Sequence, residues 1–206
     1  MATLAIKDAN GVTQYLQVSG SGTELDPHIP IQGIKQSGEV QAFFGRYMDT
    51  VGDGSGTRNQ NVDGSTTPID FYIKPGAGEV LRIARLITSI RDSGTFDSGG
   101  WGNNGGNPLN NGIELFVKQN GVENNFTEEP IRSHYDLATT SYDLAHNNWG
   151  SGDEFAVSRF TFTKSGQPIR LIGDNGDWIR LRIADNLSYL VDQRVDAQGY
   201  YENFSY

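Results

Sequence analysis

Only a few residues in this sequence have the types and spacing that chemistry at a site requires. The chain contains 3 histidines and no cysteine, which excludes disulfides, thiolate zinc sites and cysteine nucleophiles together. His134 lies close to Asp136 in the sequence, and His146 lies close to Asp143, so either pair could supply ligands to a metal ion. The segment that contains them, RSHYDLATTSYDLAHNN, is more typical of an irregular or short helical connection, and we therefore expect no metal site.

A second group of oxygen ligands, Asp49, Asp53, Ser55 and Thr57, is similar to a calcium-binding loop. The spacing lacks the glycine and the terminal glutamate of the EF-hand pattern, so solvated turns are the better interpretation. The sequence contains no serine in a GxSxG frame, and no HExxH, phosphate-loop or dinucleotide motif. We therefore expect a protein that is not an enzyme and that holds no cofactor or metal.

The acidic pairs and the tryptophans leave open the alternative that the protein cleaves or binds a glycan. Glu128-Glu129 and Asp153-Glu154 are adjacent pairs, and adjacent residues of a strand point to opposite faces, so neither pair forms a glycosidase site by itself. Trp101, Trp149 and Trp178 could stack on sugars as in a lectin, although anchoring a core is the commoner use of tryptophan.

The elements that would position these residues are strands. The 206 residues include 26 glycines, 9 tyrosines and 10 phenylalanines, a composition that fits many short strands with tight turns. The apolar patterns predict about eight to ten strands and hence an all-β, jelly-roll-type β-sandwich. The predicted strands of its body lie at 29–35, 41–48, 69–74, 79–92, 113–119, 154–164, 168–172, 178–184 and 199–202.

Three details of this pattern need interpretation. Residues 79–92 carry apolar side chains at both helical and alternating spacings, and their β-branched residues favour a long strand. The glycine-bounded turn at 173–176 predicts a hairpin between the two strands beside it. Long exposed loops are expected at 49–68 and 95–112, and the second contains Trp101.

The N-terminal segment is expected to form a separate β-hairpin arm. Residues 3–7 and 12–18 are rich in strand formers and flank an Asn-Gly turn. Residues 19–30 then form a tether that would reach about 40 Å if fully extended. A two-stranded hairpin is marginal in water, so the arm needs partners from elsewhere. We therefore divide the chain into an arm with its tether at 1–28 and a jelly-roll domain at 29–206.

The net charge of the chain and the length of its apolar runs indicate which classes of partner it can have. The formal net charge of −9 makes nucleic acid a poor partner, because a phosphate backbone would be repelled and no basic patch offsets the total. The N-terminus MATLAIKDANG lacks the charged and apolar regions of a secretion signal, and no apolar run approaches the length of a membrane span. We therefore expect a protein that is made in the cytoplasm and has no membrane partner.

Four longer segments carry a resemblance to a known family. They are ATLAIKDANGVTQYLQVSGSGTELDPHIP, KPGAGEVLRIARLITSIRDSGTFD, WGSGDEFAVSRFTFTKSGQPIRLIGDNGDWIRLRIADNL and the closing QGYYE, and together they span most of the chain. The sequence thereby resembles the virion structural proteins of tailed bacteriophages. Proteins of this kind resemble capsid decoration (cement) proteins, which are jelly-roll trimers on the outside of the head.

The resemblance implies a non-enzymatic homotrimer on the outer capsid surface of a virion, assembled in the host cytoplasm, that stabilises the head by bridging copies of the major capsid protein. In this interpretation Tyr15, Leu16 and Val18 let the arm pair with a neighbouring subunit or the shell, and Trp101 is a further interface residue. The missing cysteines and the acidic charge agree with assembly in a reducing cytoplasm and with an outward position. A tail or baseplate component, a carbohydrate-binding module for host attachment and a glycan-cleaving jelly-roll enzyme are the alternatives.

Overall fold

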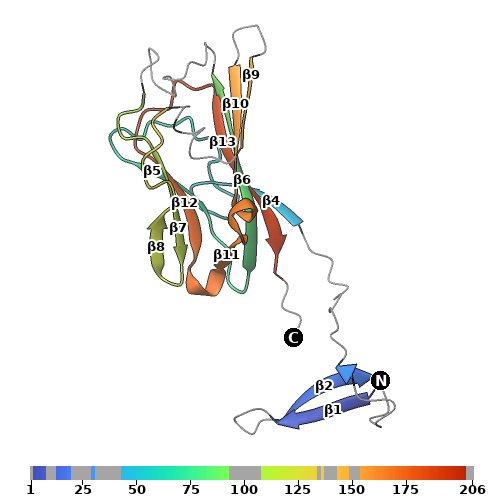
Figure 1. Cartoon of the computed structure of the whole chain (residues 1–206). Coiled ribbons are helices and arrows are strands. Elements are labelled where there is room, and N and C mark those ends of the chain that lie inside the picture. Colours follow the sequence, from blue (N-terminus) through green and yellow to red (C-terminus); the bar gives the residue numbers. More distant parts are fainter. Residues whose placement is uncertain are drawn as a thin grey trace. The chain divides into compact units, whose positions relative to one another are not determined.

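The computed structural model describes residues 2–7, 13–19, 29–30, 43–92, 108–133, 136, 143–148 and 154–202 (Figure 1). The named elements are thirteen strands and two short 3₁₀ helices, so the chain is all-β, as predicted. It divides into two units, which are residues 1–40 and residues 41–206.

The N-terminal unit is a small antiparallel sheet. β1 (Ala2–Lys7) and β2 (Thr13–Ser19) form the predicted hairpin, with Ala2 opposite Val18. β3 (Ile29–Pro30) pairs with the end of β2, which gives a three-stranded sheet in the order β1, β2, β3. Because β3 belongs to this unit, the unit extends past the predicted boundary after residue 28 and ends at residue 40. The turn of the hairpin, residues 8–12, and residues 20–28 of the predicted tether lie outside the described residues.

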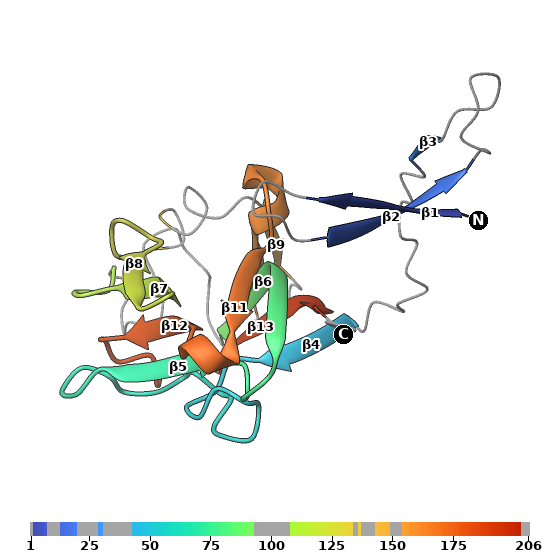
Figure 2. The same ribbon diagram turned by 90° about the horizontal axis from the view of Figure 1, so that it is seen from below.

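The larger unit is a sandwich of two antiparallel sheets (Figures 1 and 2). The six strands of one sheet are β4 (Phe43–Tyr47), β6 (Val80–Asp92), β9 (Asp143–Asn148), β10 (Glu154–Thr161), β11 (Ile169–Ile172) and β13 (Asp192–Tyr201). The four strands of the other are β5 (Ile69–Ile73), β7 (Ile113–Gln119), β8 (Val122–Asn125) and β12 (Trp178–Ile183). Their orders are β4-β13-β6-β10-β9, with β11 also paired to β6, and β5-β12-β7-β8.

The core lies between the two sheets and is built from alternate positions of the strands. In β12, for example, Ile179, Leu181 and Ile183 are buried, whereas the residues between them are only partly buried. Each fully buried apolar side chain contributes roughly 1.5–3 kcal/mol, so the packed core can hold the sandwich together in a chain without disulfides.

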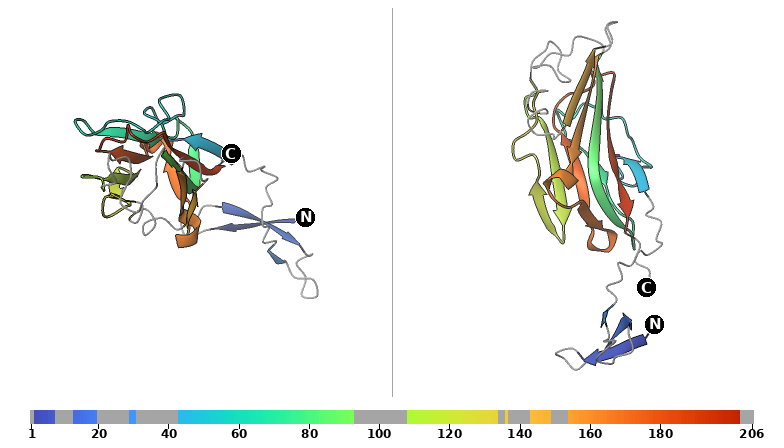
Figure 3. Two further views of the ribbon diagram at one scale, coloured as in Figure 1. Left: turned by 90° about the horizontal axis from the view of Figure 1, so that it is seen from above. Right: turned by 45° about the vertical axis from the view of Figure 1, so that its right-hand side comes forward.

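β6 is the long strand predicted at this position, and it runs for 13 residues. One of its edges pairs with β13, and its other edge pairs first with β11 and then with β10, as Figure 3 shows. A β-bulge beside Gly199 of β13 shifts the register between these two strands. At this point the alternation of buried positions in β6 shifts by one residue, from Leu81 and Ile83 to Leu86, Thr88 and Ile90.

The predicted hairpin around residues 173–176 is wrong. β11 pairs with β6 in the six-stranded sheet, whereas β12 pairs with β5 and β7 in the other sheet. A short 3₁₀ helix, η2 (Gly173–Asn175), carries the chain from one sheet to the other. Successive strands of the larger unit mostly alternate between the sheets, as they do in a jelly roll, and the jelly-roll topology itself stays a prediction.

Two further segments differ from the sequence-based expectation. The segment predicted to be an irregular or helical connection contains β9, which pairs with β10. The loop at 49–68 is less exposed than predicted, because Asp49 and Gln60 are fully buried. The N–H of Gln60 donates to the carbonyl of Gln193 at 2.9 Å, so the loop is bonded to β13 rather than solvated throughout.

Candidate functional site

Three of the four residues predicted at an interface lie in the N-terminal unit. Tyr15, Leu16 and Val18 belong to β2, within the stretch that pairs with β1. Trp101 lies outside the described residues. The role of these four residues at an interface stays a prediction.

The histidine and aspartate residues considered as metal ligands lie only partly within the described residues. His146 and Asp143 both lie in β9, whereas His134 lies outside the described residues. Among the residues that the structure describes, no group of three or more His, Cys, Asp or Glu side chains could hold a metal ion.

In the segment that is similar to a calcium-binding loop, the carboxylates accept hydrogen bonds from backbone N–H groups of the same loop. The Asp49 carboxylate accepts hydrogen bonds from the N–H of Gly52 and, at 2.6 Å, from the N–H of Gly56. Asp53 accepts a hydrogen bond from the N–H of Ser55 at 2.8 Å, and hydrogen bonds from the Ser55 side chain and backbone lower the pKa of Asp53. The carboxylates therefore order the loop, as turn chemistry predicts, but Asp49 does so from a buried position.

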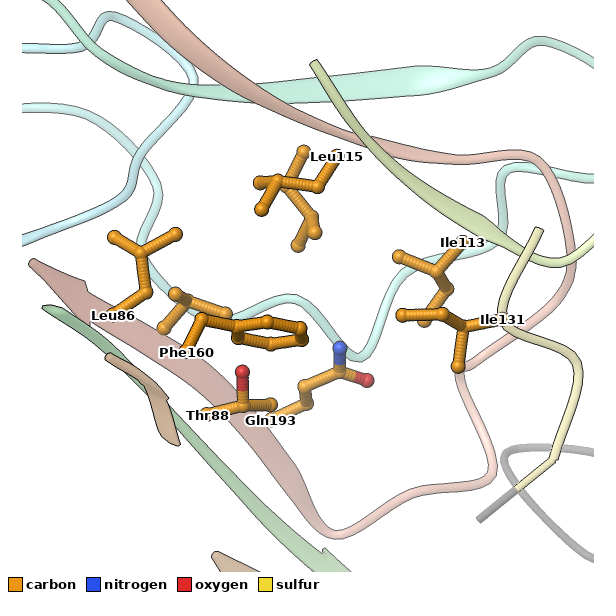
Figure 4. Close-up of a pocket in the computed structure, with 9 residues that line it drawn as sticks. Leu86, Thr88, Ile113, Leu115, Ile131, Phe160 and Gln193 are labelled. Atoms are coloured by element: carbon orange, nitrogen blue, oxygen red, sulfur yellow. The ribbon is translucent and has the colours of Figure 1, made fainter. Parts of the chain in front are cut away.

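The interior of the sandwich contains a cavity of about 20 Å³ (Figure 4). Its wall is largely apolar, and Figure 4 shows the Gln193 amide and the Thr88 hydroxyl among apolar side chains such as Phe160 and Leu115. Within the described residues, the Oε1 atom of Gln193 has no hydrogen-bond partner. A space of this size holds about one water molecule, so it cannot take an organic substrate.

The larger hollow lies on the outside, beside the edge strand β4, and has a volume of about 420 Å³. Phe43 of β4 is 77% exposed and lies opposite Tyr200 of β13. Among the described strands, β4 pairs only with β13, and none of them covers its other edge. We call this region the β4 edge surface, and it consists of Phe43, Phe44, Ala84, Arg85, Thr161, Thr163, Gln198, Gly199 and Tyr200.

The polar side of the β4 edge surface is ordered by hydrogen bonds. Arg85 Nε donates to Gln198 Oε1 at 2.7 Å, and Gln198 also hydrogen-bonds to the Asp196 carboxylate. Burial raises the pKa of Asp196, and the hydrogen bond from Gln198 offsets part of that rise. The arrangement can therefore receive another chain, because it combines an open strand edge and an exposed aromatic ring with polar groups already in place.

Sequence reasoning missed the β4 edge surface as a candidate site. Residues 41–48 were predicted as a strand, and nothing in their pattern indicates that β4 lies at an edge with Phe43 exposed. The exposure follows from the pairing of β4 with β13, a strand more than a hundred residues later in the chain.

Comparisons with protein-family models, with curated proteins and with solved structures find no match to this chain. Among the described residues, none of the helices has the length and apolar character that a membrane crossing needs.

Proposed function

We propose that this protein is a non-enzymatic structural component of a bacteriophage virion. It forms a homotrimer on the outer surface of the capsid and stabilises the head by bridging copies of the major capsid protein. The proposal starts from the resemblance of the sequence to virion structural proteins, and the arrangement of the chain in two units supports an assembling role.

The observation that carries the proposal is the separate N-terminal sheet. Its three strands are 6, 7 and 2 residues long, and they belong to a unit distinct from the sandwich. A sheet this small buries too little surface to be stable by itself. Along the described residues, β1 pairs on one side only, so its other edge is open to a strand of another chain.

The β4 edge surface supports the same proposal from the side of the sandwich. An exposed phenylalanine next to an unpaired strand edge is a liability in a protein that stays alone, because it favours association. A closed trimer would cover such edges without open-ended growth.

Two measurements test the proposal. Light scattering of the purified chain should give a mass near three times 22.6 kDa, and electron microscopy of the particle that carries it should place it on the outer capsid surface. If microscopy places the protein in the tail or baseplate, it is a structural component of that part of the virion and not a capsid decoration protein. A stable monomer that is absent from purified particles would overturn the proposal.

A further inference from the structure

The outer face of the four-stranded sheet carries an alternating set of aromatic and charged side chains. Its residues lie on β5, β12, β7 and β8 or, in the case of Lys74, directly after β5, and all except the exposed Glu123 are partly buried. We call this region the Trp178 face, and it consists of Asp70, Tyr72, Lys74, Glu114, Phe116, Lys118, Glu123, Trp178, Arg180 and Arg182. It holds four cationic and three acidic side chains, although the whole chain has a net charge of −9.

The centre of the Trp178 face is ordered by Arg180. In the pairing register this residue lies between Tyr72 of β5 and Phe116 of β7. Its guanidinium carbon lies 4.4 Å from the centre of the Phe116 ring and 5.0 Å from that of Trp178. Arg180 Nη2 also donates to Glu123 Oε1 at 2.5 Å. Arg180 therefore packs against two aromatic rings of the face while Glu123 holds its guanidinium.

One end of the face is neutralised by its own ion pairs. Arg182 donates from Nε and Nη2 to the two carboxylate oxygens of Asp70, at 2.8 and 3.0 Å. The pKa of Asp70 is lowered, because burial, which alone would raise it, is outweighed by the hydrogen bond and charge of Arg182 and by the charge of Arg180. A partner that buried this end would have to desolvate a satisfied ion pair, which costs free energy.

The other end of the face has two lysines, Lys74 and Lys118, that form no ion pair with any of the described residues. Lys118 lies opposite Trp178 in the register, and Lys74 directly follows β5 at the same end of the sheet. Lys74 Nζ lies 3.7 Å from the centre of the Tyr72 ring, and Lys118 Nζ lies 6.0 Å from that of Trp178. In the described part of the chain, no carboxylate lies within ion-pair distance of either ammonium, since Glu123, the cross-strand neighbour of Lys118, pairs with Arg180.

The two rings at this end form a corner. Tyr72 and Trp178 have ring centres 5.8 Å apart and planes at 81° to each other. Aromatic faces carry partial negative charge and attract the C–H groups of a sugar ring, while the ammonium groups attract an anion. The end therefore combines two aromatic rings with two ammonium groups for which the described residues supply no carboxylate partner.

We infer that the Lys74, Tyr72, Trp178 and Lys118 end of this face is a binding site for an acidic saccharide, such as a uronic acid oligomer. A sugar ring packs against Trp178, and the carboxylates of the oligomer pair with Lys118 and with Lys74, whose ammonium lies over the Tyr72 ring. A small ligand fits better than a protein surface because it leaves the Arg182 and Asp70 ion pair in water. The inference is independent of the proposed virion role, since it concerns a different sheet and a different ligand.

Calorimetry with the full chain tests this inference, using a tetramer of galacturonic acid as the probe and a tetramer of galactose as its neutral match. The acidic tetramer should bind with a Kd on the order of 0.1–1 mM, a normal affinity for a shallow site. Trp178→Ala should weaken binding about tenfold or more, because one stacking face is lost. The double variant Lys74→Gln with Lys118→Gln should remove the preference for the acidic over the neutral tetramer.

Phe43→Ala is the matched control, because Phe43 is an exposed aromatic residue on the other sheet, and it should leave binding unchanged. If Trp178→Ala fails to fold, the double lysine variant still tests the site, because both lysines lie at the surface of the sheet and their substitution leaves the core intact. No heat of binding with the acidic tetramer at millimolar concentration would overturn the inference. Equal binding of a poly-glutamate peptide would also overturn it, because the site would then recognise acidic protein.

Discussion

Buried aspartates hold the loops of the sandwich at several places. Asp49 and Asp177 accept N–H groups within their own or neighbouring turns, and Asp185 accepts three in a row. Each of these carboxylates is at most 5% exposed. Hydrogen bonds to a buried charge are stronger than neutral ones, so these residues replace regular secondary structure where the loops pass close to the core.

Asp185→Asn tests this role. The carboxylate accepts the N–H groups of Asn110, Asn111 and Gly112 at 3.1, 2.8 and 2.6 Å, and an amide would turn one acceptor into a donor facing another donor. We expect the free energy of unfolding to fall by about 3 kcal/mol, as measured by urea denaturation. Asp53→Asn is the control, because Asp53 is exposed and should change stability little. Equal stability of the two variants would show that the Asp185 clamp is unimportant.

Asp196 gives a prediction about pH. Burial raises its pKa in the folded state, so ionising this carboxyl disfavours folding. Its favourable contribution is therefore present below the unfolded pKa of about 3.9 and is lost as the pH rises through the folded value. Asp196→Asn cannot ionise, so its stability relative to the wild type should increase between pH 4 and pH 7. Urea denaturation at both pH values measures this, and a difference that does not change with pH would contradict it.

At the scale of the element, β6 shows what the sequence could and could not predict. Its strand character was predicted from β-branched residues, and the structure confirms it. The bulge beside Gly199 moves the buried face by one residue, so that Ile83 and Leu86 are both buried although they lie three positions apart. A bulge depends on the partner strand, and no local pattern in β6 reveals it.

Gly199→Ala tests the bulge. A Cβ atom at this position would collide with the backbone carbonyl of Arg82, which cannot move without breaking the pairing of β6 with β13. We expect a loss of roughly 2–3 kcal/mol in the free energy of unfolding, in the range of strained core substitutions. Gly76→Ala is the matched control, since its Cβ would make only ordinary contacts with Glu79. If both variants denature at the same urea concentration, the close approach at the bulge is not required.

The turn after β11 shows the limit of local reasoning. Its glycines and Asp-Asn pair do make a tight turn, as predicted, but Asp177 accepts N–H groups from both Ile172 and Asn120 and so ties the turn to the opposite sheet. Turn chemistry specifies a change of direction, whereas long-range pairing decides which sheet each strand joins. The same holds for the candidate sites: Trp178 was recognised from its type, but its lysine neighbours depend on the register of three strands.

At the scale of the whole molecule, the two units predict separable behaviour. Deleting residues 1–40 should leave the sandwich folded, because the core belongs to residues 41–206. Thermal unfolding should give one cooperative transition with little change in midpoint, while trimer formation or attachment to particles should be lost. A truncated chain that fails to fold would show that the N-terminal sheet completes the core of its own sandwich.

The central place of β13 has a consequence for how the chain folds during synthesis. β4 is made early, yet its described strand partner is β13, the last of the described strands, so the order of pairing runs against the order of translation. The four-stranded sheet can pair once β12 has emerged, and β6 can pair with β10 and β11, but β4 has no described strand partner until β13 is made. Such late, long-range closure makes folding slow and leaves nascent chains open to aggregation, so yield in the cell should depend on chaperones and on the rate of synthesis.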